Sequence, residues 1–235
     1  MKTVVSLYDY TGEALKPWAK KGYKCYAFDI QHPIDGQVED GIHYQHIDLH
    51  NYDKMSYLCD SFNDGSVVFG MAFPVCTDLA VSGAAWFKKK AEVDPDFQKK
   101  AAMYAAWCAD FFDDLGCPYF IENPVSVLAT KWRKPDYYFH PYEYGGYIPY
   151  GEEKHPLWPD YIAPRDAYPK KTCLWTGNGF KMPTKVPVEP ESGHSRQHLK
   201  LGGKSMKTKN IRSATPRGFA RAVMESNKGE YNDTT

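Results

Sequence analysis

The chain has 235 residues, of which 43% are hydrophobic and 25% are charged. This length buries the core of one α/β domain with a small insertion. No run of 18 apolar residues occurs, and the first residues lack the features of a secretion signal, so we expect a cytoplasmic protein without a membrane span. The six cysteines form no Cys-x-x-Cys pair, and no histidine cluster has zinc-like spacing, so we expect reduced thiols and no metal.

The formal net charge of zero conceals an uneven distribution of charge. Residues 1–130 hold 11 basic and 18 acidic side chains, whereas residues 131–235 hold 18 basic and 11 acidic ones. Residues 196–221 contain eight basic residues and no acid, which is typical either of a solvated loop or of a polyanion-binding surface. The interspersed Gly, Ser, Thr and Asn residues favour a DNA-contacting loop. The residues predicted to bind nucleic acid are Arg196, Lys200, Lys204, Lys207, Lys209 and Arg212.

Strands and helices are predicted to alternate along the first half of the chain. Residues 4–8 form an apolar strand, followed by a Thr-Gly turn at 11–12 and a helix to about residue 20. A second strand over 22–30 ends in an acid, and the interval between the two strands is that of a β-α-β unit. A third strand over 43–48 also ends in an acid, and a fourth over 66–71 leads to Cys76.

Residues 97–115 have the apolar spacing of a buried amphipathic helix, and residues 117–121 form the next strand, which leads to Glu122. This alternation predicts a doubly wound, mostly parallel, Rossmann-like sheet, with functional side chains at the carboxyl ends of its strands.

The composition changes after about residue 132, where Pro, Tyr, His and Gly replace the periodic pattern. A helix is again predicted near the end, over about 216–226, with Thr215 as its cap. The predicted organisation is a catalytic and cofactor-binding core over 1–133, a small irregular and DNA-contacting insertion over 134–168, a return to the sheet over 169–182, a basic loop over 183–212 and a helix that completes the core over 213–227.

The order of these features resembles the catalytic domain of DNA cytosine-5 methyltransferases, especially the short forms of phages and prophages. The resemblance rests on short motifs in the right order across most of the chain except 134–168. These are Leu-Tyr-Asp-Tyr-Thr-Gly at 7–12, Phe-Asp-Ile at 28–30, Asp-Leu at 48–49, Phe-Pro-Val-Cys at 73–76, Glu-Asn-Pro at 122–124, Pro-Lys-Lys-Thr at 169–172 and Ser-Ala-Thr-Pro-Arg-Gly-Phe-Ala at 213–220.

The resemblance implies a function and a set of site residues. The activity is transfer of a methyl group from S-adenosylmethionine to C5 of a cytosine flipped out of double-stranded DNA. Cys76 adds to C6 of the ring, Glu122 assists at N3, Asn123 shapes the loop, and Lys170 or Lys171 contacts the cytosine carbonyl. The implied cofactor-binding residues are Tyr8, Tyr10, Thr11, Gly12, Asp29, Ile30, Asp48, Leu49, Phe73 and Pro74.

Several positions depart from the pattern of that family. Tyr10 stands where the first cofactor-loop glycine falls, and we expect its side chain to obstruct the backbone approach that glycine allows. Glu13 replaces a small residue, and Val75 replaces the proline that stiffens the nucleophile loop. Lysine at 170 or 171 replaces arginine, which exchanges a planar fork for a point charge.

Two alternatives to methyl transfer remain open from the sequence. The same fold and nucleophile can serve an altered donor or another one-carbon modification of C5, for which Tyr10 and Glu13 would reshape the pocket. The chain can also be a catalytically inactive DNA-binding or decoy homologue. An RNA substrate, the target sequence and the oligomeric state are not determined by these motifs.

Overall fold

A single mixed sheet forms the centre of the molecule. The structure, a computed structural model, describes residues 1–203 and 205–229. Within these residues the strand order is β3-β4-β2-β1-β5-β6-β8-β7. β3 and β8 run opposite to the other strands, which share one direction. The strands are β1 (Thr3–Leu7), β2 (Lys24–Asp29), β3 (Gln37–Glu39), β4 (Ile42–His46), β5 (Val67–Ala72), β6 (Tyr119–Pro124), β7 (Tyr137–Phe139) and β8 (Thr172–Gly177).

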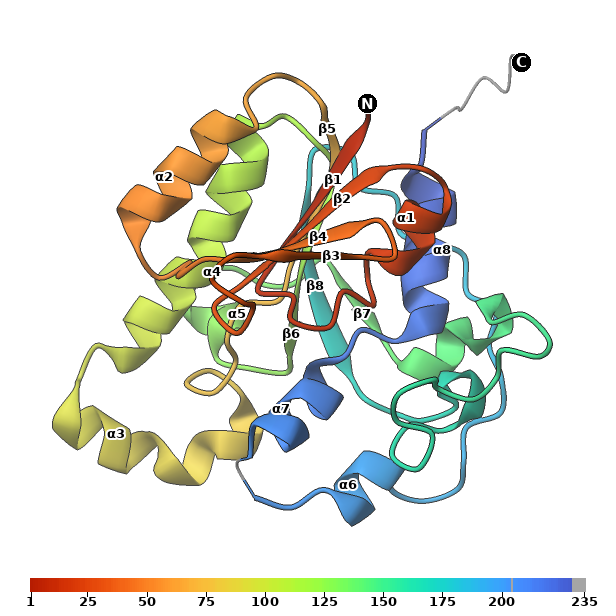
Figure 1. Cartoon of the computed structure of the whole chain (residues 1–235). Helices are drawn as coiled ribbons and strands as arrows, with labels where there is room; N and C mark the ends of the chain where they lie inside the picture. The colour runs from red at the N-terminus through yellow and green to blue at the C-terminus, as the bar shows by residue number, and fades with distance from the viewer. Residues whose placement is uncertain (204, 230–235) are drawn as a thin grey trace.

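Helices cover both faces of the sheet (Figure 1). α2, α4 and α5 pack on one face and α1 and α8 on the other, so each face has its own apolar core. The α-helices are α1 (Lys16–Lys20), α2 (Tyr52–Ser61), α3 (Phe87–Val93), α4 (Phe97–Asp114), α5 (Leu128–Lys131), α6 (Arg196–Lys200), α7 (Met206–Ser213) and α8 (Arg217–Asn227). The 3₁₀ helices are η1 (Val81–Trp86), η2 (Pro141–Tyr147) and η3 (Pro164–Asp166).

This arrangement confirms the predicted fold class, a doubly wound and mostly parallel Rossmann-like sheet. Burial on both faces explains the continuous apolar runs of the central strands, because residues such as Val4, Val5 and Leu7 have no exposed side to present. None of the helices in the described residues combines the length and the apolar character needed to cross a membrane.

The second half of the chain is more regular than its composition suggests. Residues 137–139 join the sheet as edge strand β7, and the segment expected to be a basic loop contains α6 and α7. Each helix begins at a serine, Ser195 or Ser205, whose side chain accepts the backbone N–H of the residue three positions later, His198 or Thr208. Their apolar residues pack against the insertion in a small third core (Ile162, Ala163, Tyr168, Leu201, Ile211 and Ala214).

Gly70 in the central strand β5 lies against α4 and tolerates no side chain. A Cβ added there would lie 2.2 Å from the ring of Phe112, which is fully buried. We expect Gly70→Ala to lower the free energy of unfolding by about 1–3 kcal/mol, since the packed core has to shift to admit a methyl group. Urea denaturation measures the change. Gly202→Ala is the control, because a Cβ at Gly202 meets nothing within 4 Å, and an equal loss in both variants would contradict the prediction.

Candidate active site

The loop after β1 folds around a buried carboxylate. Asp9 accepts hydrogen bonds from Ser6 Oγ and from the Gly12 backbone N–H, each at 2.8 Å, and burial raises its pKa to about 6. Gly12 has φ 65°, and a Cβ there would lie 2.4 Å from the Tyr44 hydroxyl, so both the conformation and the space require glycine. Thr11 completes the turn with a weak contact to Asp9 at 3.4 Å.

The two tyrosines of this loop lie in different environments. Tyr10 is 40% exposed, and its ring stacks on His32 at a centroid distance of 5.7 Å, so it is turned outward from the loop. The left-handed residue is Tyr8, with φ 57°, a conformation that strains a bulky side chain. Its hydroxyl donates to the Leu49 carbonyl at 3.1 Å, and burial raises the pKa of this phenol. Tyr8 therefore links the end of β1 to the segment that follows β4.

The remaining predicted cofactor residues lie at the carboxyl ends of the neighbouring strands. Asp29 is buried and accepts from the Gln31 N–H at 2.8 Å, and Asp48 accepts from the His50 N–H at 3.0 Å. Each acid thus caps the turn after its strand through one carboxylate oxygen. Ile30 is exposed and Leu49 is buried. Phe73 follows β5, where its N–H donates to the Leu7 carbonyl, and Pro74 is buried beside it.

Cys76 lies in the loop after β5, and Asn123 attaches this loop to β6. The Asn123 amide donates to the Pro74 carbonyl at 2.9 Å, and the N–H groups of Leu79 and Ala80 donate to the Cys76 carbonyl to close a turn. Burial and the nearby Glu122 carboxylate raise the pKa of the Cys76 thiol, whereas the Lys170 ammonium lowers it. The neighbouring Val75 is 48% exposed.

Glu122 lies within β6, opposite Leu174 of β8, and not after the end of the strand as its sequence pattern predicts. The reversed strand β8 pairs with β6 as far as Pro124 and so extends it beyond its parallel neighbour. Burial raises the pKa of Glu122, and Lys170 partly offsets this. Glu122 Oε1 is buried and has no hydrogen-bond partner among the described residues. It faces a small pocket lined by Phe73, Glu122, Phe139, Lys170, Ser213, Ala214, Thr215, Pro216 and Phe219.

The two candidate lysines have separate environments. Lys170 interacts electrostatically with both Cys76 and Glu122, and its ammonium also donates to the Arg212 carbonyl at 2.9 Å. Lys171 is exposed and lies over the ring of Tyr138, 4.7 Å from its centroid. Consecutive residues in extended backbone point to opposite sides, which explains why only Lys170 shares the pocket.

Replacing Lys170 is expected to make the Cys76 thiol less reactive. Loss of the ammonium removes the charge that lowers the pKa of Cys76, so the thiolate fraction at neutral pH falls. We expect alkylation of Cys76 by iodoacetamide to slow severalfold in Lys170→Ala. Peptide mass spectrometry locates the alkylated cysteine. Lys171→Ala is the matched control, and equal rates in the two variants would contradict the assignment.

Most of the residues predicted to bind nucleic acid contact other parts of the protein itself. The Arg196 guanidinium pairs with Glu191 and donates to the Pro159 carbonyl, and Lys200 donates to the Asp160 carbonyl at 2.9 Å. Arg212 donates to the Leu201 carbonyl, and Lys207 lies over the ring of Tyr161. Lys209 is exposed on α7, and Lys204 lies outside the described residues. These contacts hold α6 and α7 against residues 158–163.

Some buried polar residues near the site were not identified from the sequence. Asp166 has φ 50° and accepts from the Gly218 N–H at the start of α8, and burial raises its pKa to about 6. His155 is 2% exposed and lies near Arg217. Asp9 carried a recognisable signal, because an Asp three residues before a Gly is typical of a side-chain-capped turn. Asp166 and His155 had no comparable local pattern.

Comparisons with known proteins leave the family of the chain unassigned. No protein-family model matches the sequence, and no curated protein sequence matches it. One solved structure with a similar backbone is that of a prophage-encoded protein of E. coli, provisionally described as a DNA modification methyltransferase. The two share 12% identity with a TM-score of 0.42, over 75% of this chain. The chain spans 46% of the length of that protein. A likeness this remote assigns no activity.

Proposed function

We propose that this chain is a DNA methyltransferase that transfers a methyl group from S-adenosylmethionine to C5 of cytosine, through a covalent bond between Cys76 Sγ and C6. One observation carries the proposal. Three side chains from separate parts of the chain interact electrostatically: the Cys76 thiol after β5, the Glu122 carboxyl group in β6 and the Lys170 ammonium before β8. Addition of a thiolate to a pyrimidine needs these three kinds of group together.

The residues at the neighbouring strand ends suit the proposed donor. Asp29 offers a buried carboxylate for ribose hydroxyl groups, and Asp48 offers one for an amino group of the base. Asp9 interacts electrostatically with Asp29 and with Glu13, and this group of acids makes the edge of the sheet favourable for a sulfonium cation. When bound, the donor supplies an electrophilic methyl group.

The raised pKa of Glu122 suits the addition step, because it favours the protonated acid, whereas formation of the Cys76 thiolate depends on the Lys170 ammonium, which lowers the pKa of the thiol. Because each group opposes ionisation of the other, the pair favours a single negative charge, which Lys170 compensates. With that charge on sulfur, Cys76 adds to C6 while protonated Glu122 gives its proton to N3, so the electron pair of the C5–C6 double bond is available at C5. After methylation, a water molecule or hydroxide takes the C5 proton, the C5–C6 double bond forms again as the C6–S bond breaks to return the thiolate, and N3 gives its proton back to Glu122.

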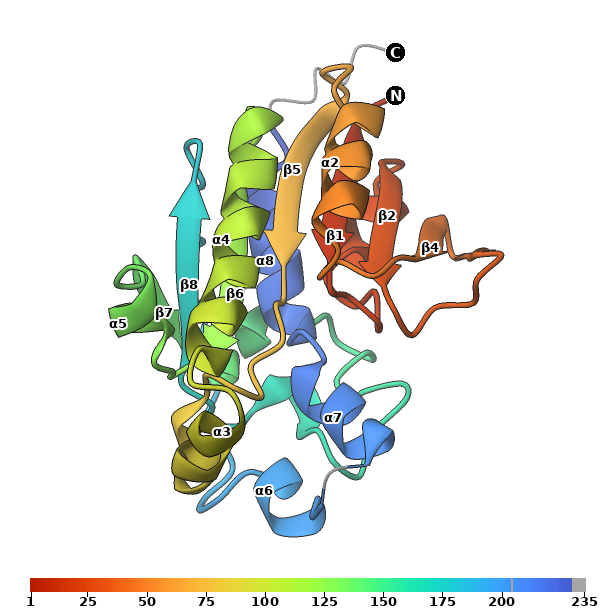
Figure 2. The same cartoon turned by 90° about the vertical axis from the view of Figure 1, so that its left-hand side faces the viewer.

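The DNA-facing end of the molecule is proposed to be the end that carries the Cys76 loop. α3, α6 and α7 all lie at this end, beyond the carboxyl ends of the parallel strands (Figures 1 and 2). α3 follows the Cys76 loop, buries none of its residues and exposes Lys88 and Lys89. Together with Lys207 and Lys209 on α7, these lysines supply positive charge for the backbone of a duplex with one base flipped out.

The test is incubation of the protein with S-adenosylmethionine and duplex DNA that contains 5-fluorocytosine. Fluorine at C5 prevents the final proton loss, so we expect a protein–DNA adduct that survives denaturation and whose mass includes one added methyl group. The same duplex with ordinary cytosine is the control and leaves no lasting adduct. Intact DNA binding without an adduct would contradict the proposal and favour a decoy homologue. An added mass other than one methyl group would favour an altered donor, and a preference for the matching RNA would replace DNA as substrate.

A further inference from the structure

Lys90 of α3 contacts the loop that carries Cys76. Its ammonium donates to the Thr77 carbonyl at 3.1 Å and pairs with the Asp78 carboxylate. Thr77 and Asp78 are the two residues that directly follow Cys76. The ammonium also lies over the ring of Phe97, the first residue of α4, 6.0 Å from its centroid. One side chain therefore joins the nucleophile loop, α3 and α4.

α3 packs no residue into either core, so contacts at its surface decide where it lies. None of its seven residues is buried. The Phe87 ring meets the Phe97 ring edge-on at a centroid distance of 5.8 Å, and Lys90 adds the contacts described above. Figure 2 shows α3 below the lower end of α4, outside the helices that cover the sheet. Because a helix this short has little stability of its own, its place relative to the Cys76 loop depends on such contacts.

The nucleophile loop has further contacts on both sides of its cysteine. Pro74, before the cysteine, is held by β6, and residues 79–81, after it, pair with residues 125–127. Lys90 acts between these two points, on the peptide group that follows Thr77. Only the two soft dihedral angles of Thr77 separate that group from the peptide group of the cysteine, so fixing it restricts the backbone of the nucleophile.

Lys90 differs from the two lysines that precede it. Lys88 and Lys89 are exposed and available for the phosphates of DNA, whereas the half-buried Lys90 is already paired with Asp78. The charge of Lys90 is therefore compensated, and the charges that most shift the pKa of Cys76 come from other residues. Lys90 thus acts on the nucleophile through geometry.

We propose that Lys90 is a positioning residue that holds the Cys76 loop in its reactive geometry before any substrate binds. The inference rests on the proposed function, because it assigns Lys90 a role in the addition of Cys76 to C6. Addition needs the sulfur above the face of the ring, and a displacement of a reacting group by about 1 Å costs roughly 100-fold in rate. Loss of the ammonium frees the Thr77 carbonyl and leaves Asp78 without its counter-ion, so the loop samples other positions.

Steady-state methylation of DNA by Lys90→Met tests this role, because methionine keeps most of the stem of the side chain without the ammonium. We expect kcat to fall at least tenfold while the KM for DNA changes less than threefold. Lys90→Arg, whose guanidinium can donate to both acceptors, is expected to restore most of the lost kcat. Lys99→Met, at an exposed position of α4, is the matched control and is expected to behave as the parent. A parent-like kcat in Lys90→Met would overturn the proposal.

Hydrogen exchange of the free protein reports on the loop without any reaction. The Leu79 and Ala80 N–H groups donate to the Cys76 carbonyl, so they are expected to exchange at least tenfold faster in Lys90→Met and at the parent rate in Lys99→Met. Parent-like exchange in Lys90→Met would contradict the inference. If the parent itself neither methylates DNA nor forms an adduct, the proposed function fails, and the exchange rates alone decide whether Lys90 holds the loop.

A double-mutant cycle identifies the ion pair as the source of the effect. Asp78→Asn is expected to lower kcat in the parent but to add little further loss in Lys90→Met, because both changes remove the same contact. Additive losses would show that the two residues act independently, against the proposal. A half-exposed ion pair contributes little to global stability, so these variants are expected to unfold near the parent temperature. A large drop in that temperature for Lys90→Met would replace the positioning role by a structural one.

Discussion

Cys76→Ser is expected to reduce methyl transfer by roughly 10⁴-fold or more, the scale of losing a covalent nucleophile. Serine preserves the size and the backbone contacts of the loop, but its hydroxyl does not ionise near neutral pH and is a poor nucleophile without a base. The same variant is expected to form no adduct with 5-fluorocytosine DNA while it binds unmodified DNA as the parent does. Methyl incorporation from labelled S-adenosylmethionine measures the first effect, and denaturing electrophoresis measures the second.

The matched control for this loss is Cys59→Ser. Cys59 is a half-buried thiol on α2, and burial with the Asp114 and Asp60 carboxylates raises its pKa, but no ammonium group in the described part of the chain lowers it as Lys170 lowers that of Cys76. Cys59→Ser should therefore retain activity and adduct formation. If Cys76→Ser also retains activity and adduct formation, Cys76 is not the nucleophile and the proposed reaction is wrong.

The parts of the fold that were predictable are those encoded by local patterns. The helix over 97–115 was predicted almost to the residue, because its apolar spacing repeats over α4. The strands that carry Asp29 and Cys76 on their carboxyl side were predicted from apolar runs that end at polar residues. The Rossmann-like sheet followed from their alternation with helices.

The parts that were not predictable depend on register and on contacts between distant segments. The placement of Glu122 inside β6 results from pairing with β8, which is about fifty residues later in the chain. Which of the two neighbouring lysines, Lys170 or Lys171, lies at the Glu122 pocket depends on the direction in which each side chain points just before β8. The contacts of Arg196 and Arg212 were also unpredictable, because each guanidinium donates to a backbone carbonyl that no local sequence pattern identifies.

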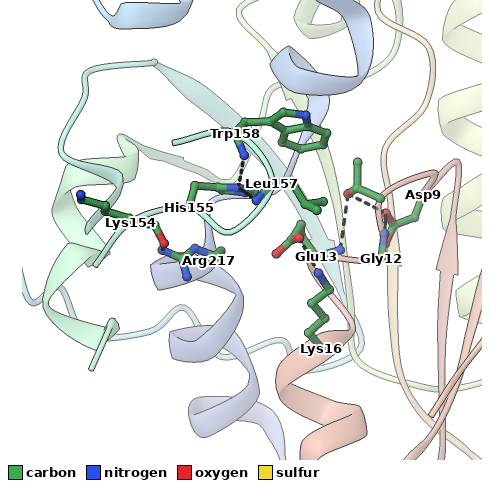
Figure 3. Close-up of polar contacts among 10 residues, drawn as sticks. Asp9, Gly12, Glu13, Lys16, Lys154, His155, Leu157, Trp158 and Arg217 are labelled. Carbon is green, nitrogen blue, oxygen red and sulfur yellow. Dashed lines mark hydrogen bonds and ion pairs between the residues drawn. The ribbon is translucent and has the colours of Figure 1, made fainter. Parts of the chain in front are cut away.

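The environment of Glu13 in the structure could not be inferred from its position in the sequence. In the sequence it was a departure from the small residue of a cofactor loop. In the structure it is buried beside Lys16 (Figure 3) and faces a cavity shared with α8, more than two hundred residues further along the chain. Arg217 and Arg221 of α8 also line that cavity, and their approach to Glu13 depends on the whole fold, so motif spacing could not predict the cavity.

Glu122→Gln is expected to reduce methyl transfer by about 10²–10⁴-fold, the usual contribution of a positioned general acid. The amide keeps the shape of the side chain but has no proton to give to N3 as Cys76 adds to C6. Single-turnover methylation across a range of pH measures the effect. In the parent, Glu122 must be protonated, and its raised pKa extends the active range toward neutral pH. We expect the parent rate to fall as pH rises through that pKa and the residual rate of the variant to lack this step.

Stability should change in the opposite direction, which separates a catalytic loss from misfolding. Because the pKa of Glu122 is raised in the folded state, the folded chain binds the proton more tightly than the unfolded chain. The associated stability is fully present below the ordinary carboxyl pKa and is lost as pH rises through the raised pKa of the folded state. Glutamine carries no charge at any pH, so the variant escapes this loss, and its free energy of unfolding relative to the parent should increase from acidic to neutral pH. Urea denaturation at several pH values measures the difference. A variant that is inactive and also less stable than the parent at neutral pH would show that Glu122 maintains the fold of the pocket and does not act as the proton donor.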